Sequence, residues 1–327
     1  MSQTPFFTVA IPTYNRAELL RQAITGLLNQ TFRDFELLIA DNCSEDHTPE
    51  VVKSFDDPRI RYVRHDENRG AVANFEYTFE QARTPYFVAH QDDDLLCGDF
   101  LERAHAGLAS DSQAVIFATT FWRGSAASGY SAELAAGCVD PTLGNLVAGE
   151  PRLIDGPRLA TRFLYSAPII FPTLAVRCDV LREAYNHGWT ENIGGDYITT
   201  VRILLQGKCS YDPRIGGVWR VNNDNLSYQY WKPERNAISG RMYHRLVEEL
   251  DAAGVEWAAA LREDLAGFDS GQLMSLARRW VRSDAPNSMI RLIRELLVST
   301  NKRSGLWLWR RMISRIGLRG ATKIMRA

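Results

Sequence analysis

The sequence predicts an α/β fold in which a mostly parallel sheet carries helices on both faces. Over residues 7–94, short apolar runs alternate with longer segments whose apolar residues recur at helical spacing. Such alternation is typical of βαβ units, because consecutive parallel strands need a crossover connection, usually a helix. Polar side chains directly follow three of the four apolar runs, and a parallel sheet would gather them at one edge.

Four short strands and three helices account for this first region. The expected strands are Phe7–Pro12, Phe35–Ala40, Arg59–Arg64 and Tyr86–His90. The first helix begins with Asn15 as its cap, and Glu18 three residues later completes a pattern close to a capping box. The second helix begins at Thr48, since Pro49 fits a first helical turn, and the third spans Gly70–Ala82.

The most informative polar group is the run Asp92, Asp93 and Asp94, which directly follows the fourth strand. Three adjacent carboxylates repel one another unless solvent screens them or a cation neutralises them. Oxygen-rich sites of this kind suit magnesium or manganese holding a substrate diphosphate. A solvated acidic turn that caps the next helix is the alternative interpretation. The other polar residues expected at the same edge are Thr13, Tyr14, Asp41 and Asn42.

Two glycine-rich phosphate-binding patterns are absent from the sequence. No G-x-G-x-x-G follows the first strand, and no G-x-x-x-x-G-K-[ST] occurs anywhere. These absences argue against a dinucleotide cofactor and against hydrolysed ATP. A nucleoside diphosphate held through a metal is the remaining economical solution.

Several segments, in this order, resemble the start of a family 2 glycosyltransferase with the GT-A fold, which is Rossmann-like. They are Val9–Arg16, Leu28–Phe32, Phe35–Ser44, Asn68–Gly70 and Asp92–Leu95. The resemblance implies an enzyme that transfers a sugar from a nucleotide-diphosphate donor to a hydroxyl group of a glycan, lipid-linked saccharide or glycoside, with inversion at the anomeric carbon.

The resemblance also implies which residues contact the nucleotide sugar. They are Pro12, Thr13, Tyr14, Arg16, Asp41, Asn42, Arg69 and Asp92. Asn42 stands where the family usually has a second acid. An amide can accept from a base N–H and donate to a carbonyl, so a UDP or dTDP donor is expected.

The same likeness places a metal ion, Mn2+ or Mg2+, on Asp93, with Asp94 supporting the metal or capping the next helix. A metal there would neutralise charge on the departing diphosphate. Gln91 replaces an acid that the family often has. Asn222 lies where the family often has a histidine that completes the metal shell.

Asp196 matches the general base of the family, which would take the proton from the acceptor hydroxyl. Gly195 stands in place of the usual glutamate before it. The alternative is that Asp196 only caps its helix, a position favoured by the helix dipole.

The expected domains are a catalytic domain over 1–231 and a helical C-terminal region over 232–327 that is also a candidate dimerisation element. Within the first, 1–110 would form the donor half and 111–231 the acceptor half. The stretch 303–327 interleaves basic residues with tryptophans. It predicts either a helix on an anionic membrane surface or one packed on the domain.

Charge, cysteine content and the N-terminal sequence indicate which partners and which cellular compartment to expect. The formal net charge of -1 at pH 7 gives no reason to expect a nucleic-acid partner. The five cysteines are scattered without C-x-x-C spacing, and the N-terminus carries no signal-like segment. We therefore expect a cytoplasmic enzyme, placed at the inner face of the membrane if its tail binds lipid.

Two other functions fit parts of the pattern. A glycosyltransferase-like module that binds nucleotide sugars without catalysis is suggested by Gly195, Gln91 and Asn222, but Asp93 and Asp196 argue against it. A sugar nucleotidyltransferase would need a glycine-rich, basic loop after the first strand, and the sequence has none there.

Overall fold

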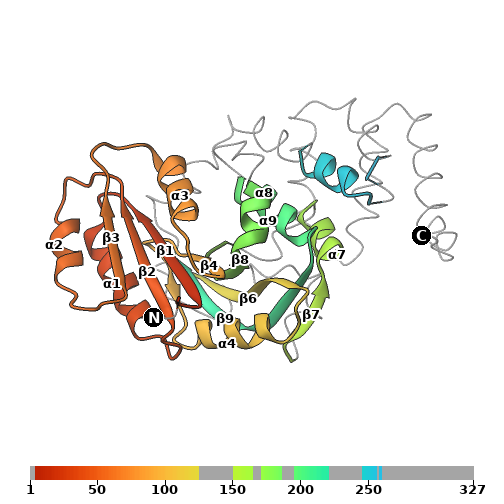
Figure 1. The fold of residues 1–327 in the computed structure, drawn as a ribbon, viewed down its shortest axis with the longest axis horizontal. Helices are drawn as coiled ribbons and strands as arrows, with labels where there is room; N and C mark the ends of the chain where they lie inside the picture. The colour runs from red at the N-terminus through yellow and green to blue at the C-terminus, as the bar shows by residue number, and fades with distance from the viewer. Residues whose placement is uncertain are drawn as a thin grey trace, which may run out of the picture. The chain divides into compact units, whose positions relative to one another are not determined.

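The structure, a computed structural model, describes residues 4–124, 150–164, 171–185, 195–220, 245–255 and 258–259. The first part consists of β1 (Phe7–Thr13), α1 (Ala17–Leu28), β2 (Phe35–Asp41), α2 (Thr48–Lys53), β3 (Ile60–Arg64), α3 (Ala71–Glu80) and β4 (Tyr86–Ala89). The four strands and three helices predicted from the sequence are confirmed here, with ends that differ by at most two residues (Figure 1).

A second series of elements continues the same sheet. It consists of β5 (Leu95–Leu96), α4 (Phe100–Ala109), β6 (Ala114–Gly124), β7 (Arg152–Asp155), α7 (Gly156–Ala160), η2 (Thr161–Leu164), η3 (Phe171–Thr173), β8 (Leu174–Arg177), α8 (Cys178–Tyr185), α9 (Gly195–Leu204) and β9 (Lys208–Arg220). Among the described residues, nine strands form one sheet in the order β3-β2-β1-β4-β8-β6-β9-β5, and β7 pairs with β9.

The direction of the strands changes across this sheet. The pairs β3-β2, β2-β1 and β1-β4 are parallel, as the sequence predicts. Beyond β4 the sheet is mixed, because β8 runs antiparallel to both β4 and β6, whereas β6 is parallel to β9. The expected α/β class is therefore confirmed, with the uniformly parallel part confined to the N-terminal strands.

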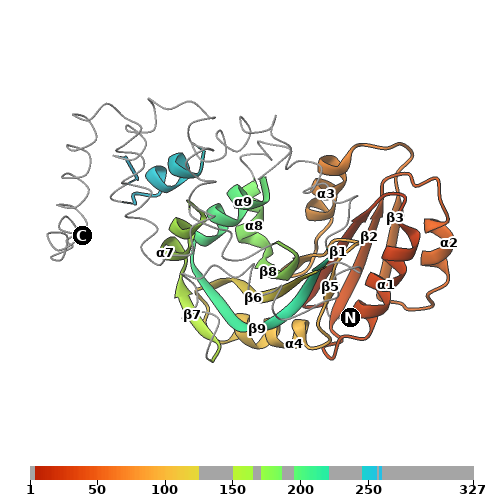
Figure 2. The ribbon, with the colours of Figure 1, turned by 180° about the vertical axis from the view of Figure 1, so that it is seen from behind.

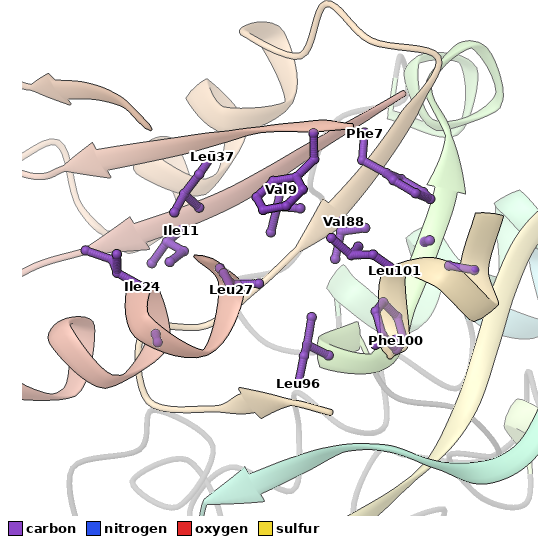
Figure 3. Packing of buried hydrophobic residues seen from close by; sticks show 14 of the residues in the cluster. Phe7, Val9, Ile11, Ile24, Leu27, Leu37, Val88, Leu96, Phe100 and Leu101 are labelled. Carbon is purple, nitrogen blue, oxygen red and sulfur yellow. The ribbon is translucent and has the colours of Figure 1, made fainter. Parts of the chain in front are cut away.

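One face of the parallel strands forms the hydrophobic core. Alternate residues of β1, namely Phe7, Val9 and Ile11, are fully buried and pack against the apolar side of α1 (Figure 3). Side chains of β2, β4 and α4 join the same cluster. Parallel strands are buried on both faces, so the other face of the sheet must also pack against a helix. Helix α3 packs there, and its Phe79 ring lies 4.8 Å from the ring of Phe87 on β4.

The start of α1 differs from the prediction. The cap residue is Arg16, and no side chain of the cap position bonds to the helix. Asn15 has a φ of 52°, and its Oδ1 accepts from the Glu45 backbone N–H at 2.7 Å. Instead, Asp46 Oδ2 accepts from the Ala17 N–H at 3.1 Å, so a residue from the next loop satisfies this helix end.

The chain divides into two compact units, Met1–Phe163 with Ala167–Lys232, and Leu164–Ser166 with Pro233–Ala327. In the second unit, residues 245–252 are helical. Among the described residues, no helix is both long and apolar enough to cross a bilayer. The basic tail over 303–327 lies outside the described residues, so its membrane role, a dimer interface and the functions assigned to the domains stay predictions.

Leu37 is fully buried in the core, so we expect Leu37→Ala to lower the free energy of unfolding by about 2–5 kcal/mol through lost contacts and the cavity left behind. Leu153 on β7 is 41% exposed, and Leu153→Ala should change this free energy by less than about 0.5 kcal/mol. Urea unfolding of both variants is the measurement. Equal unfolding midpoints would contradict the assignment of Leu37 to the core.

Candidate active site

The ends of β1 and β4 form the topological switch point of the sheet. The chain proceeds from β1 to β2 and β3 on one side, and then β4 returns to pair with the other side of β1 (Figure 1). Open parallel sheets bind ligands at such a point, because the loops after the two strands diverge there. In this chain, those loops carry the first strand-to-helix turn and the acidic run.

The first turn and the acidic run are joined by side-chain hydrogen bonds. Thr13 Oγ1 donates to Asp92 Oδ2 at 2.8 Å. Arg16 Nη1 donates to Asp92 Oδ1 at 2.9 Å and to Asp93 Oδ2 at 3.0 Å. Both carboxylates are buried, and together with Asp94 they form what we call the acidic turn. The structure therefore brings together four of the residues predicted from the sequence.

Asp94 is held from the far end of the sheet. Its Oδ1 accepts from the backbone N–H of Arg220, the last residue of β9, at 3.0 Å. The Arg220 side chain donates to the carbonyl of Asp93 and, at 2.5 Å, to Oε1 of Gln22 on α1. Asp94 does not cap α4, since that helix begins after Asp99.

The short strand β5 brings β9 to this place. Directly after the acidic turn, β5 pairs antiparallel with β9, as Leu95 faces Val218 and Leu96 faces Gly217 (Figure 2). A Cβ on Gly217 would lie 2.7 Å from the Leu95 carbonyl oxygen. Glycine is therefore required for this close approach of the two backbones.

Burial dominates the electrostatics of the acidic turn. It raises the pKa of Asp92 to about 6, although the Arg16 guanidinium opposes the shift. Burial and the neighbouring Asp93 charge raise the pKa of Asp94 well above its usual value. His90 is also buried, and desolvation together with Arg220 lowers its pKa to about 3, so its imidazole is neutral. The buried carboxylates of the acidic turn are therefore stabilised by positively charged partners, of which Arg16 is one.

Asp41 is held inside the turn after β2. Its carboxylate accepts from Tyr62 Oη at 2.5 Å and from the Ser44 N–H at 2.9 Å, and Arg64 Nε lies 3.7 Å away. Desolvation and the Asp41 charge raise the pKa of Tyr62, which keeps the phenol protonated as a donor. Asp41 is fully buried, so these contacts fix the turn, and its predicted contact with a base stays a prediction.

Asn42 has a defined amide orientation. Its Nδ2 donates to Asn68 Oδ1 at 2.8 Å, and its Oδ1 accepts from the Arg69 N–H at 2.9 Å. Asn68 Oδ1 also accepts from the Gly70 N–H at 2.9 Å. The amide of Asn42 retains one further N–H and one further lone pair, the pair of groups that a pyrimidine edge could use.

Three other residues predicted to contact the nucleotide have different surroundings. Pro12 is partly buried near the end of β1, and Tyr14 is 39% exposed. Arg69 is exposed, and its guanidinium lies 5.9 Å from the centre of the Tyr77 ring. None of these positions conflicts with a nucleotide contact, and each contact stays a prediction.

Asp196 lies in the first turn of α9. Burial raises the pKa of its carboxyl to about 6, although hydrogen bonds from the backbone N–H groups of Tyr197 and Asp196 itself oppose the shift. Those bonds fit the predicted capping role. The hydrogen bonds and ion pairs among the described residues do not join Asp196 to the acidic turn, and residues 186–194 before it are not described.

A site built from several metal ligands is not seen among the described residues, where no three His, Cys, Asp or Glu side chains are arranged to hold an ion. Asn222 lies outside the described residues, so its predicted part near the metal cannot be placed. One carboxylate is compatible with Mg2+ or Mn2+, because phosphate oxygens and water supply the other ligands.

Sequence reasoning missed several residues that hold the site together: Gln22, Tyr62, Arg64, Asn68 and Arg220. Asn68 belongs to Asn68–Gly70, one of the segments that resemble the family, so the sequence carried a signal for it. For Arg220 no local signal exists, because its bond to Asp94 joins residues 126 positions apart.

Comparison with known proteins shows the family. The sequence model described as "Glycosyl transferase family 2" matches residues 8–183, more than half of the chain. The Campylobacter jejuni GalNAc(5)-diNAcBac-PP-undecaprenol beta-1,3-glucosyltransferase is 35% identical over 112 residues, which are 32% of this chain and 36% of that protein. The chain thus spans about a third of the length of this curated relative.

Solved structures share the fold at low sequence identity. S. aureus TarS 1-349, in complex with UDP-GlcNAc, matches with a TM-score of 0.63 and 15% identity, over 91% of this chain and 82% of that one. The mannosyltransferase PcManGT from Pyrobaculum calidifontis, in complex with GDP-Man and Mn2+, matches with a TM-score of 0.50 and 17% identity. The match covers 99% of this chain and 84% of that one. The predicted GT-A fold is confirmed, and the chain belongs to glycosyl transferase family 2.

Proposed function

We propose that this protein is an inverting, metal-dependent glycosyltransferase that uses a UDP or dTDP sugar. The observation that carries the proposal is the hydrogen-bonded group of Thr13, Arg16, Asp92 and Asp93 at the switch point. This group combines a guanidinium suited to phosphate with carboxylates suited to ribose hydroxyls and a cation. Family membership supports the same class of reaction.

The nucleotide would lie along the first turn and the loop after β2. Tyr14 is exposed on the first turn and offers an aromatic face to a base. Asn42, with its orientation fixed by Asn68 and the Arg69 N–H, would both accept from and donate to a pyrimidine edge. Asp92 would accept from ribose hydroxyls.

Mn2+ or Mg2+ fits Asp93 better than Asp94. Asp94 Oδ1 is bonded to a backbone N–H, which cannot move aside, whereas Asp93 Oδ2 accepts from the long side chain of Arg16, which can move. The raised pKa values around the turn indicate that a cation would be stabilised there. The metal supplies Lewis-acid neutralisation of the negative charge on the leaving diphosphate.

Asp196 would act as the general base. A carboxylate with a pKa near 6 is ionised at neutral pH and is a stronger base than an ordinary aspartate. It would remove the proton from the acceptor hydroxyl as that oxygen attacks the anomeric carbon on the face opposite the diphosphate. A single displacement of this kind inverts the anomeric configuration.

The acceptor would be a glycan, a lipid-linked saccharide or a glycoside. The name of the Campylobacter relative specifies an undecaprenol-linked saccharide, which supports the lipid-linked class. An acceptor of that kind would place the enzyme at the inner face of the membrane.

Asp93→Ala should lower sugar transfer by about 10²–10³-fold and abolish stimulation by Mn2+, because charge on the leaving group loses its stabilisation. The assay is transfer or hydrolysis of the donor that most raises the melting temperature among UDP, dTDP and GDP sugars. Asp56→Ala, at an exposed position, is the control. Unchanged turnover in Asp93→Ala would contradict the metal role, and donor binding by the wild type without any turnover would favour a non-catalytic module.

Asp94 was predicted to support the metal, but its hydrogen bond favours a role in holding the turn. Asp94→Asn keeps an acceptor for the Arg220 N–H, so most of the activity and its Mn2+ stimulation should remain. Asp94→Ala leaves that buried N–H unpaired, and stability should fall by about 1–3 kcal/mol. Loss of Mn2+ stimulation in the Asn variant, measured by the same assay, would restore Asp94 as a metal ligand.

The proposed role of Asp196 as general base predicts that kcat decreases on the acidic side of its pH profile. The general base must be deprotonated, so kcat should fall as the pH drops through about 6 and protonates it. Because the pKa of Asp92 is also about 6, kcat is measured at saturating donor, and donor binding is followed separately by thermal shift. Asp196→Asn should abolish transfer while leaving donor binding intact. Transfer by this variant with an unaltered profile would exclude Asp196 as the base.

A further inference from the structure

Arg16 occupies a particular place in the acidic turn. A single nitrogen, Nη1, lies 2.9 Å from Asp92 Oδ1 and 3.0 Å from Asp93 Oδ2. One positively charged group thus bridges two buried carboxylates, as a metal ion between them would. The Arg16 side chain is 25% exposed, so it can leave this position without opening the core.

The local backbone directs Arg16 to this position. The preceding Asn15 has a φ of 52°, and its N–H donates to Ser44 Oγ at 2.9 Å. Arg16 itself lies just before the first turn of α1. The turn is therefore fixed by the loop after β2 and presents Arg16 to the acidic turn.

The geometry points to a role for Arg16 as the built-in counter-cation of the acidic turn, one that holds the metal affinity low until a nucleoside diphosphate binds. This inference rests on the proposed function and adds the order of binding to it. The diphosphate offers its own oxygens to the guanidinium, which then releases the carboxylates.

The charges around the acidic turn support this order, in which the metal binds tightly only together with the diphosphate. The Arg16 guanidinium already bonds to the carboxylates of both Asp92 and Asp93, so its positive charge offsets part of their negative charge. A divalent cation added alone at Asp93 would compete with Arg16 for that carboxylate and would lie close to a guanidinium, which repels it. The negative charge of a diphosphate offsets both cations.

Metal and nucleotide should therefore increase each other's affinity, because coupling between two binding sites is reciprocal. Removing the charge of Arg16 should strengthen binding of the metal alone. It should also weaken the coupling, since the nucleotide then has no guanidinium to move away from the carboxylates.

The test is calorimetric titration of Mn2+ into the full chain, with and without saturating UDP. In the wild type, UDP should raise the Mn2+ affinity at least about tenfold, and in Arg16→Gln the affinity without UDP should rise by a similar factor. Arg16→Lys keeps the charge and should retain weak binding of the metal alone. Arg61→Gln is the matched control, since Arg61 pairs with Glu36 at similar exposure, 29%, on β3 and should behave like wild type.

The outcomes separate the two proposals. Absence of Mn2+ binding to the wild type with UDP would contradict the metal-dependent function itself. Mn2+ binding that does not depend on UDP in the wild type would overturn the inference alone, whatever the variants do. Unchanged or weaker Mn2+ binding to folded Arg16→Gln without UDP would overturn it as well, with the melting temperature as the check on folding.

Discussion

The burial of three neighbouring carboxylates at the switch point is the constraint on which the rest of the site depends. Removing a carboxylate from water costs several kcal/mol, and only hydrogen bonds and opposite charges offset that cost. Each of the three has such partners: Thr13 and Arg16 for Asp92, Arg16 for Asp93, and the Arg220 N–H for Asp94. The site is therefore held in shape by the groups that neutralise it.

This requirement links parts of the chain that are far apart in sequence. Arg220 ends β9, yet it contacts both the acidic turn and Gln22 on α1. The antiparallel pairing of β5 with β9 makes that contact possible, and Gly217 permits the approach. The mixed half of the sheet thus holds the acidic turn in place as well as continuing the sheet.

The sequence predicted the parallel strands well, because apolar runs buried on both faces leave a signal that depends only on neighbouring residues. It also predicted that Thr13 and Asp92 lie together, since the ends of parallel strands share one edge. It failed at Asn15, where contacts with Ser44 and Glu45 replaced the local capping pattern. It could not predict the role of Arg220, because this residue reaches Asp94 only through the pairing of strands that are far apart in the sequence. The periodicity of apolar residues carries no information about such distant partners.

Asn42 shows that the same constraint on buried charge applies to the turn after β2. Asp41 beside it is already fully buried, and its carboxylate accepts from Tyr62 Oη while Arg64 Nε lies 3.7 Å away. A carboxylate at position 42 would add another buried negative charge and would lose the bond that the Asn42 amide donates to Asn68. An amide keeps the acceptor for the Arg69 N–H and removes the charge. The departure from the usual family residue is therefore consistent with the surrounding bonds.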